Sequence, residues 1–326
     1  MARRILMINT ERGWRGGENQ VWLLARRLTA GFEAITACQA GETLDERLRA
    51  VGSRTCALCA RSGFDLGAIR MLRRLMRDER IDLVHAHASH AHSLAVWACL
   101  GSDVPLVVTR RVDFGIGGNP LRRWKYQRAT RIAAVSGGVQ RVLADGGIPA
   151  ERIEVIHDGV DLAFIRGGDP STLRTRLGIP ASAVVFGITA HLTDHKDHRT
   201  LLHAFARVEA AVPDAWLLIA GTGELADELQ ALAGELRLAR CRFLGFVPDV
   251  RDVLGALDVF VLSSHMEGLG SSVMDAMARG IPVVATRAGG LPELVDHDRD
   301  GVLVPVRDPT ALSAAMIRLA HDRDLR

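Results

Sequence analysis

Short apolar runs alternate with longer amphipathic segments along the whole chain. In the first half the apolar runs predict strands at 4–9, 35–40, 81–87, 105–109, 131–136 and 152–157. Between these runs, residues 66–80 carry apolar side chains at helical spacing, and a helix is also expected at about 18–30. Strands that are buried on both faces read as continuous apolar runs, so this alternation predicts a parallel sheet covered by helices.

The second half of the chain repeats the same scheme. Strands are predicted at 184–190, 215–221, 241–246, 259–264, 282–286 and 301–306, with helices at about 197–211, 224–236, 249–256, 271–279 and 308–320. Segment 161–180 contains Gly167, Gly168 and Pro170, which is typical of a linker. The pattern therefore predicts an α/β protein with two Rossmann-like doubly wound domains, residues 1–163 and 164–326. A ligand is expected in the interdomain cleft, at the C-terminal ends of the strands.

Charge is distributed unevenly between the two halves. Residues 1–163 hold 24 Lys/Arg and 17 Asp/Glu, a net of +7, whereas residues 164–326 hold 17 and 21, a net of −4. This asymmetry indicates an anionic partner for the first half, and solvated arginines on helix faces are the alternative. Residues 122–128 interleave Trp124 and Tyr126 with four cations, a composition that favours a membrane surface. A nucleic-acid partner would require more aromatic residues than this chain offers.

Several classes of protein are disfavoured by motifs that the sequence lacks. The apolar run near the N-terminus covers only residues 5–8, too short for a signal peptide, and no run reaches about 18 apolar residues. No G-x-G-x-x-G follows a predicted strand, which argues against NAD binding, and no G-x-S-x-G motif is present, which argues against an α/β-hydrolase. The five scattered cysteines are expected to be reduced, as in a cytosolic protein.

The stretch EGLGSSVMDAMARGIPVVAT, residues 267–286, combines groups suited to binding a ligand. Gly268 and Gly270 permit a tight loop, and Gly270 or Ser271 is expected to cap a helix whose free N–H groups would bind an anion. Glu267 and Asp275 flank this position, and carboxylates accept hydrogen bonds from pairs of hydroxyls. A phosphate site between two carboxylates fits a nucleotide sugar.

The segment FGITAHLTDHK, residues 186–196, adds a cation to this site. Lys196 and Lys125 are the only lysines in a chain with 39 arginines. A lysine ammonium acts as a compact point charge on phosphate, so Lys196 is predicted to lie near the phosphate of the bound molecule. The alternative is a surface lysine without a function.

The stretch VHAHASHAHS places four histidines, at positions 85, 87, 90 and 92, within eight residues. A metal-dependent hydrolase is one hypothesis, because H-x-H-x-D-H opens many two-metal sites. Ser89 stands where that motif needs its aspartate, however. The other hypothesis is a single histidine at a strand end, near the reacting centre.

The order and spacing of these segments resemble glycosyltransferase family 4 (glycosyl transferases group 1), which are retaining enzymes of the GT-B fold. The similarity runs through RGGENQVWLLARRL, VHAH, AVSGGVQRVLADGGIPAERIEVIHDGVD, TAHLTDHKD and EGLGSSVMDAMARGIPVVATRAGGLPELV. It covers nearly the whole chain, and it implies an N-terminal acceptor-binding domain and a C-terminal donor-binding domain. By the same resemblance, the relatives continue into a final C-terminal helix, which the second domain is expected to lack in this sequence.

The resemblance also implies roles for individual residues. His87, Glu267 and Lys196 would be catalytic, with Lys196 neutralising the leaving diphosphate. The residues expected to bind the donor are Gly16, Gly17, His191, Lys196, Val247, Glu267, Gly268, Leu269, Gly270, Ser271 and Asp275. Those expected on the acceptor side are Glu18, Arg110, Arg111 and Asp113, and two guanidiniums would suit an anionic acceptor.

Two positions depart from the family pattern. His191 stands where the family usually has arginine, and Asp275 stands where it usually has glutamate. These departures keep two alternatives open, namely a non-catalytic nucleotide-sugar binder and a GT-B epimerase.

The expected activity is transfer, with retention, from a UDP-, GDP- or ADP-linked sugar to a saccharide or lipid-linked acceptor in bacterial envelope polysaccharide or lipopolysaccharide synthesis. No metal or other cofactor is expected to take part. The expected location is the cytoplasm, with peripheral contact to the inner membrane.

Overall fold

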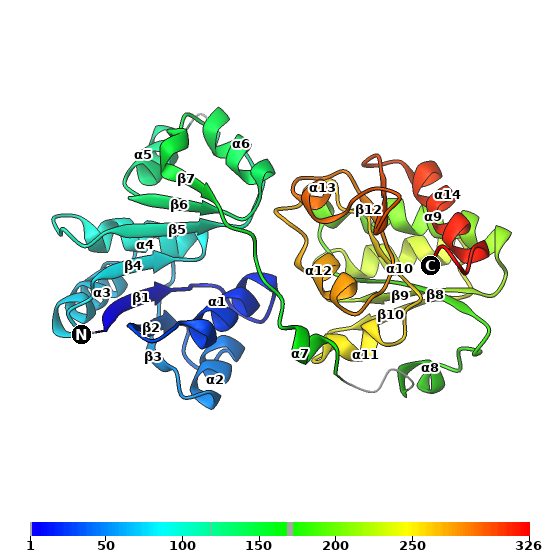
Figure 1. Cartoon of the computed structure of the whole chain (residues 1–326), viewed down its shortest axis with the longest axis horizontal. Helices are drawn as coiled ribbons and strands as arrows, with labels where there is room; N and C mark the ends of the chain where they lie inside the picture. Colours follow the sequence, from blue (N-terminus) through cyan, green and yellow to red (C-terminus); the bar gives the residue numbers. More distant parts are fainter. Residues whose placement is uncertain (1, 118, 168–171) are drawn as a thin grey trace. The chain divides into compact units, whose positions relative to one another are not determined.

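The computed structural model describes residues 2–117, 119–167 and 172–326, and the chain divides into two compact units (Figure 1). Unit 1 is Met1–Gly159 and unit 2 is Val160–Arg326. This division lies four residues before the boundary expected between 163 and 164. Of the expected linker, Gly168 and Pro170 lie outside the described residues.

Within its described residues, unit 1 contains a sheet of seven parallel strands in the order β3-β2-β1-β4-β5-β6-β7. The strands are β1 (Arg3–Ile8), β2 (Phe32–Cys38), β3 (Arg54–Ala57), β4 (Leu83–Ala86), β5 (Leu106–Arg110), β6 (Arg131–Ala134) and β7 (Ile153–Val155). The helices between them are α1 (Gly16–Arg27), α2 (Thr43–Ala50), α3 (Leu66–Asp78), α4 (Ser89–Cys99), α5 (Pro120–Gln127) and α6 (Gly137–Asp145), with a 3₁₀ turn, η1, at Ala150–Arg152.

The sequence-based prediction missed several elements of unit 1, among them α2 and β3. β3 is a four-residue edge strand without a fully buried residue, so it has no apolar run to mark it. α2 buries only Leu44, Asp45 and Leu48, and the rest of the helix is polar. Both elements are short and lie at one end of the sheet, where the periodicity of side chains is weakest.

The described part of unit 2 contains six parallel strands in the order β10-β9-β8-β11-β12-β13. The strands are β8 (Val184–Thr189), β9 (Ala215–Ala220), β10 (Cys241–Gly245), β11 (Val259–Leu262), β12 (Val283–Thr286) and β13 (Gly301–Val304). The helices are α7 (Leu162–Ile165), α8 (Thr172–Arg176), α9 (His198–Ala211), α10 (Ala226–Glu235), α11 (Val250–Leu254), α12 (Ser271–Ala278), α13 (Leu291–Leu294) and α14 (Pro309–His321), with a 3₁₀ turn, η2, at Asp194–Lys196.

The core of unit 2 follows directly from its apolar runs. All six residues of β9 are buried, and Phe186, Phe205 and Phe260 are fully buried between the sheet and its helices. Burying each such side chain contributes about 1.5–3 kcal/mol. The central strands are therefore held rigidly, and the loops at their C-terminal ends start from fixed positions.

Each sheet reverses its strand order once. In unit 1 the reversal lies between β1 and β4, and in unit 2 it lies between β8 and β11. Loops leave the two strands in opposite directions at such a point, which opens a crevice at the C-terminal edge of the sheet, where ligands of doubly wound proteins bind. The residues after β1, β4, β8 and β11 are therefore the ones to inspect for function.

Among the described helices, none combines the length and the apolar character needed to cross a membrane.

Candidate active site

The loop after β8 carries His191 and Lys196 and is pinned against the loop after β9. Leu192 donates its backbone N–H to the Thr222 carbonyl at 2.9 Å. The two loops approach so closely that a Cβ atom at Gly221 would lie 1.9 Å from the Ala190 carbonyl oxygen. At Gly223 it would lie 2.2 Å from the Leu192 carbonyl oxygen. Only glycine fits at these two positions, which the sequence-based prediction did not single out, although a G-x-G after a strand was the available signal.

The loop after β11 completes the site, and it brings Lys196 and Glu267 together. The Lys196 ammonium donates to Oε2 of Glu267, and the Ser264 hydroxyl donates to the same oxygen at 3.1 Å. The two charged side chains are only 17% and 12% exposed. The Ser263 hydroxyl also donates to the Lys196 carbonyl at 2.9 Å, so the two loops at the strand-order reversal form one bonded structure.

Helix α12 begins at the end of this second loop. Gly270 is its N-cap residue, with φ of 105°, and no side chain caps the helix. A Cβ atom at Gly270 would lie 2.6 Å from Cδ2 of Leu291, so the left-handed turn is packed tightly against α13. Leu269 is buried beneath the loop, while Ser271 opens the helix and is partly exposed. The first N–H groups of α12 therefore lack a side-chain cap, which is the arrangement that accepts an anion.

Asp275 lies on α12, one turn beyond its start. The residue is partly buried, and burial raises the pKa of its carboxyl to about 6. Among the described residues it has no hydrogen-bond or ion-pair partner. A carboxyl group in such surroundings is free to accept hydrogen bonds from the hydroxyls of a bound molecule.

One further histidine, which the sequence-based prediction did not select, follows the β8 loop directly in the sequence. His198 opens α9, is 1% exposed, and has no hydrogen-bond partner at either ring nitrogen within the described part of the chain. Burial, together with the nearby charges of Lys196, His191 and His195, lowers its pKa to about 3. Its imidazole is therefore neutral and supports the loop by packing.

Two further donor candidates lie beside these loops. His191, partly buried, accepts the Thr193 backbone N–H at its carbonyl at 2.9 Å. Val247 follows β10 and packs on the core of unit 2. The end of β10 lies next to the glycine pair, because Gly221 donates its N–H to the Gly245 carbonyl at 2.8 Å.

In unit 1, His87 directly follows β4 at the strand-order reversal. The residue is 6% exposed, and its ring stacks on His85 with 3.9 Å between centroids. Burial, His85 and Arg111 keep its pKa well below the usual value, so the imidazole is neutral. Arg111 can only donate, and its Nη1 lies 3.5 Å from Nδ1 of His87. The proton of His87 therefore resides on Nε2, which is buried and has no partner among the residues described.

Glu18 occupies an internal position that the sequence-based prediction did not foresee. It lies in the first turn of α1 and is 3% exposed. One carboxylate oxygen accepts the Arg15 backbone N–H at 3.1 Å, and the other accepts the Asn9 side-chain amide at 3.4 Å. Burial raises the pKa of this carboxyl. In the structure Glu18 thus fixes the start of α1 to the end of β1, and a contact with the acceptor stays a prediction.

Gly16 and Gly17 open helix α1 next to Arg111. A Cβ atom at Gly17 would lie 4.0 Å from Cδ of Arg111, an ordinary contact distance. The loop after β1 and the side chain after β5 therefore lie side by side at the C-terminal edge of the first sheet, beside His87.

The two arginines expected to bind an anionic acceptor are engaged within the protein. Arg111 pairs with Asp158 through Nε at 3.2 and 3.3 Å. Arg110 donates to the Tyr126 hydroxyl, and to the carbonyls of Val112 and Phe114. Arg110 thereby shapes the loop that carries the partly buried Asp113. The structure shows what these guanidiniums hold in place, and acceptor binding by Arg110, Arg111 and Asp113 stays a prediction.

The histidines of VHAHASHAHS have separate surroundings. Nε2 of His85 lies 2.7 Å from the Thr109 hydroxyl, and Nε2 of His92 lies 3.1 Å from the Lys125 carbonyl. His90 is exposed at the start of α4. No group of three or more His, Cys, Asp or Glu side chains in the described ranges is placed to hold a metal ion. The arrangement does not favour the metal-dependent hydrolase hypothesis.

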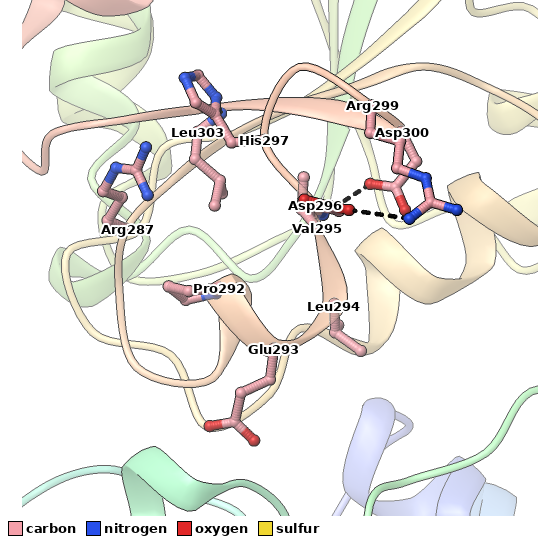
Figure 2. Close-up of a pocket in the computed structure, with 10 residues that line it drawn as sticks. All are labelled: Arg287, Pro292, Glu293, Leu294, Val295, Asp296, His297, Arg299, Asp300 and Leu303. Atoms are coloured by element: carbon pink, nitrogen blue, oxygen red, sulfur yellow. Dashed lines mark hydrogen bonds and ion pairs between the residues drawn. The ribbon is translucent and has the colours of Figure 1, made fainter.

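A cavity of about 650 Å³ lies elsewhere in unit 2, beside α13 and the loop that follows it (Figure 2). Figure 2 shows the Asp296 carboxylate bonded to Arg299 on its rim, at 3.3 Å. None of the predicted donor residues lines this cavity. The candidate site at the loops after β8 and β11 shares none of its predicted residues with this cavity.

Together, two parallel doubly wound sheets, each with polar residues at its strand-order reversal, define a protein of the GT-B class. Among solved structures, HepE from Anabaena in complex with UDP-glucose is similar to this chain, with a TM-score of 0.86 and 23% identity over 99% of this chain and 91% of that one. The chain belongs to glycosyltransferase family 4. The family model "Glycosyltransferase Family 4" matches residues 14–164, and "Glycosyl transferases group 1" matches residues 170–326.

Two curated relatives illustrate the range of this family. An N-acetyl-alpha-D-glucosaminyl L-malate synthase of Bacillus anthracis is 26% identical, over 80% of this chain and 71% of its own length. The lipopolysaccharide core biosynthesis glycosyltransferase LpsE of Rhizobium meliloti is 31% identical, over 65% of this chain and 60% of its own length. The comparisons support a glycosyltransferase that acts on nucleotide sugars.

Proposed function

We propose that this protein transfers a sugar from a nucleotide-diphosphate sugar to a saccharide or lipid-linked acceptor, with retention of configuration and without a metal. The observation that carries the proposal is the Lys196–Glu267 pair beside the uncapped start of α12, at the strand-order reversal of unit 2. A cation, free N–H groups and two carboxylates within a pair of bonded loops match the parts of a nucleotide sugar.

Each group has a distinct task in this reaction. The Lys196 ammonium and the N–H groups of α12 would bind the diphosphate and stabilise its charge as it leaves. Glu267, held by Ser264, would accept hydrogen bonds from the transferred sugar, and Asp275 from the ribose. The bond between the anomeric carbon and the phosphate oxygen breaks with its electron pair, and the acceptor oxygen forms the new bond on the same face. The acceptor's proton passes to a phosphate oxygen of the donor.

The neutral imidazole of His87 supports a binding role in unit 1. Its Nε2 carries the proton and faces no protein acceptor in the described part of the chain, so it would donate a hydrogen bond to a substrate oxygen. Because burial, His85 and the Arg111 guanidinium hold the pKa of His87 low, the histidine is not suited to take up the acceptor's proton. Transfer of that proton to the donor phosphate fits this environment better.

The relatives indicate a setting for the reaction. LpsE is named for lipopolysaccharide core biosynthesis. We place the present protein in the assembly of a bacterial envelope polysaccharide or lipopolysaccharide, in the cytoplasm and in peripheral contact with the membrane.

The proposed membrane contact is supported by a patch formed by α4, α5 and the segment just before α3. Leu121 and Phe64 are 64% and 58% exposed. Phe64 packs edge-on against Trp97, whose ring lies 5.5 Å from that of Trp124, and Arg128 lies 5.3 Å from the Trp124 ring. Aromatic and aliphatic side chains edged with cations suit the interface of an anionic bilayer.

The test is a thermal-shift screen of UDP-, GDP- and ADP-sugars, followed by donor hydrolysis and by transfer to saccharide and lipid-linked acceptors. A donor at 100 times its Kd should stabilise the wild type by about 2.7 kcal/mol. The double variant Lys196→Met with Glu267→Gln removes both charges together and so leaves no buried charge unpaired. It should stay folded, lose at least 100-fold in kcat/KM and show no donor shift.

Two outcomes would contradict the proposal. Donor binding without hydrolysis or transfer would indicate a non-catalytic nucleotide-sugar binder, and conversion of the donor sugar without transfer would indicate an epimerase. Full turnover in the double variant would remove Lys196 and Glu267 from the mechanism.

A further inference from the structure

A second cavity, of about 460 Å³, lies at the C-terminal edge of the unit 1 sheet. Its lining comes from the loops after β1, β2 and β3, which are neighbouring strands, and from the start of α4 (Figure 1). The lining residues are Thr10, Glu11, Arg12, Arg15, Gln39, Ala60, Arg61 and His90. Of these residues, only His90 was named from the sequence, in the metal hypothesis, and none is among the residues predicted to bind the donor.

The charge of this cavity is strongly positive. The lining residues carry three guanidiniums, from Arg12, Arg15 and Arg61, and one carboxylate, that of Glu11, which gives a net charge of +2 when His90 is neutral. The Asp65 carboxylate, which accepts the Arg61 backbone N–H at 3.3 Å, lies next to this lining. Within the described ranges, none of the three guanidiniums has a hydrogen-bond or ion-pair partner. This differs from Arg110 and Arg111, whose guanidiniums are bound to groups of the protein itself.

The loop that carries Arg12 and Arg15 is held in place by its backbone and by its other side chains. The Glu11 N–H donates to the Asn9 side chain at 2.8 Å, and the Gly13 N–H donates to Glu42 at 3.0 Å. Trp14 packs against Trp22 with 6.4 Å between the ring centroids. The side chains of Arg12 and Arg15 are therefore not needed to shape the loop. Both are exposed to solvent, on a loop whose backbone is held in place.

Hydrogen bonds from Gln39 also hold the loops around the cavity in place. The Gln39 side-chain amide donates to the Thr10 carbonyl at 3.3 Å and to the Ala60 carbonyl at 3.2 Å, which ties the three loops together. Thr10 is 8% exposed, and its hydroxyl has no hydrogen-bond partner among the described residues. A buried hydroxyl of this kind costs free energy unless a bound molecule or water satisfies it.

We infer that this cavity binds a phosphate monoester on the acceptor, and that Arg12, Arg15 and Arg61 select phosphorylated acceptors. A phosphate monoester carries a charge of about −1.5 to −2 at pH 7, which matches the net charge of the lining. A guanidinium binds two phosphate oxygens at once, in bidentate fashion. A preformed cavity with few carboxylates favours this binding. The inference rests on the proposed transfer reaction, for which it names the acceptor class.

The first experiment requires neither donor nor turnover. Thermal stability is measured against inorganic phosphate for the wild type, for the triple variant Arg12→Gln, Arg15→Gln, Arg61→Gln, and for Arg70→Gln. Arg70 is an exposed arginine of α3 without a described partner, and it serves as the matched control. Phosphate should stabilise the wild type and the control more than the triple variant. Equal phosphate dependence in all three proteins would overturn the inference.

The second experiment measures transfer to pairs of acceptors that differ only in one phosphate, in a water-soluble series and in a lipid-linked series. The wild type should prefer the phosphorylated member, and each Arg→Gln change should lower kcat/KM for it about tenfold. Single Arg→Lys variants keep the charge and the fold, and they should recover only part of the loss because the bidentate geometry is gone. The series in which the preference appears identifies a soluble sugar phosphate or a lipid head group as the source.

The two proposals fail in different ways. Transfer by the wild type that ignores the phosphate, or a preference for a carboxylate over a phosphate, would refute the phosphate site and leave the glycosyltransferase proposal intact. Loss of donor turnover with phosphate binding still sensitive to the three arginines would refute the proposed function and leave the anion site.

Discussion

The ionised Asp275 carboxylate is expected to lower the stability of the folded protein at neutral pH. Its carboxyl is partly buried without a described partner, and burial raises its pKa from 3.8 to about 6. The folded protein therefore binds this proton more tightly than the unfolded chain does. The resulting contribution to stability is present at low pH and is lost as the pH rises through about 4 to 6. At neutral pH the ionised group is a cost that a bound ribose would offset.

We expect Asp275→Asn to be more stable than the wild type at pH 7.5 by about 1 to 3 kcal/mol, because no buried charge remains. The difference should vanish below about pH 4, where both side chains are neutral. Donor affinity should fall about tenfold, since the amide accepts fewer hydrogen bonds than the carboxylate. Chemical denaturation at both pH values and donor titration by calorimetry measure the two effects.

Asp275→Glu is the matched control, because it keeps the charge and adds one methylene. It should retain donor binding without the gain in stability. If the Asn variant binds the donor as tightly as the wild type, Asp275 does not contact the donor.

At the scale of elements, close backbone packing positions the loop after β8, which carries Lys196. The loops after β8 and β9 are bonded through Leu192 and Thr222, and the glycines at 221 and 223 leave no room for a side chain. The same loop then carries Lys196 to Glu267. The position of the ammonium thus depends on two glycines of the neighbouring loop.

We predict that Gly223→Ala lowers stability by about 1 to 3 kcal/mol, because its Cβ would lie 2.2 Å from a carbonyl oxygen and the backbone must shift. The displaced loop should reduce kcat/KM at least tenfold through Lys196. Thermal denaturation and donor turnover measure the two effects.

Gly234 in α10 offers the comparison, because a Cβ atom there would meet nothing within 4 Å. Gly234→Ala should stabilise the protein by about 0.5–1 kcal/mol without loss of activity, since alanine is the better helix former. A Gly223→Ala protein with unchanged turnover would show that the β8 loop tolerates displacement.

At the scale of the whole molecule, the two halves of the chain differ in net charge and in exposed apolar surface. The first half, with its net charge of +7, carries the patch of exposed Leu121 and Phe64 and half-buried Trp97 and Trp124, as well as the arginine cavity. The second half, with a net charge of −4, carries the single lysine of the donor site. A positive surface around an apolar patch attracts an anionic bilayer, and salt weakens this attraction.

We expect the protein to bind vesicles that contain anionic lipid and to be released as ionic strength rises. Leu121→Asp should reduce the bound fraction several-fold in a sedimentation assay, because it places a negative charge in the patch. Val51→Asp, at an exposed apolar residue of unit 1 outside the patch, should bind as the wild type does. Equal loss in both variants would mean that net charge alone governs binding.

Periodicity alone predicted the central strands and long helices of both sheets, because these elements bury continuous apolar runs or one apolar face. It missed α2 and β3, which bury too little to leave a pattern. Motif spacing also brought together Lys196, Glu267 and the start of α12 correctly. The same reasoning could not anticipate that Arg110 and Arg111 are engaged by Tyr126 and Asp158, because these partners lie 16 and 47 residues away.

The sequence by itself therefore determined the fold class, the parallel order of strands and helices, and the residue types at the proposed donor site, since these depend on local periodicity and on short motifs. Tertiary structure alone decided which charges are free to meet a ligand. Arg12, Arg15 and Arg61 converge on one cavity only because β1, β2 and β3 are neighbours in the sheet. Asp275 gains its raised pKa only from the burial that packing imposes.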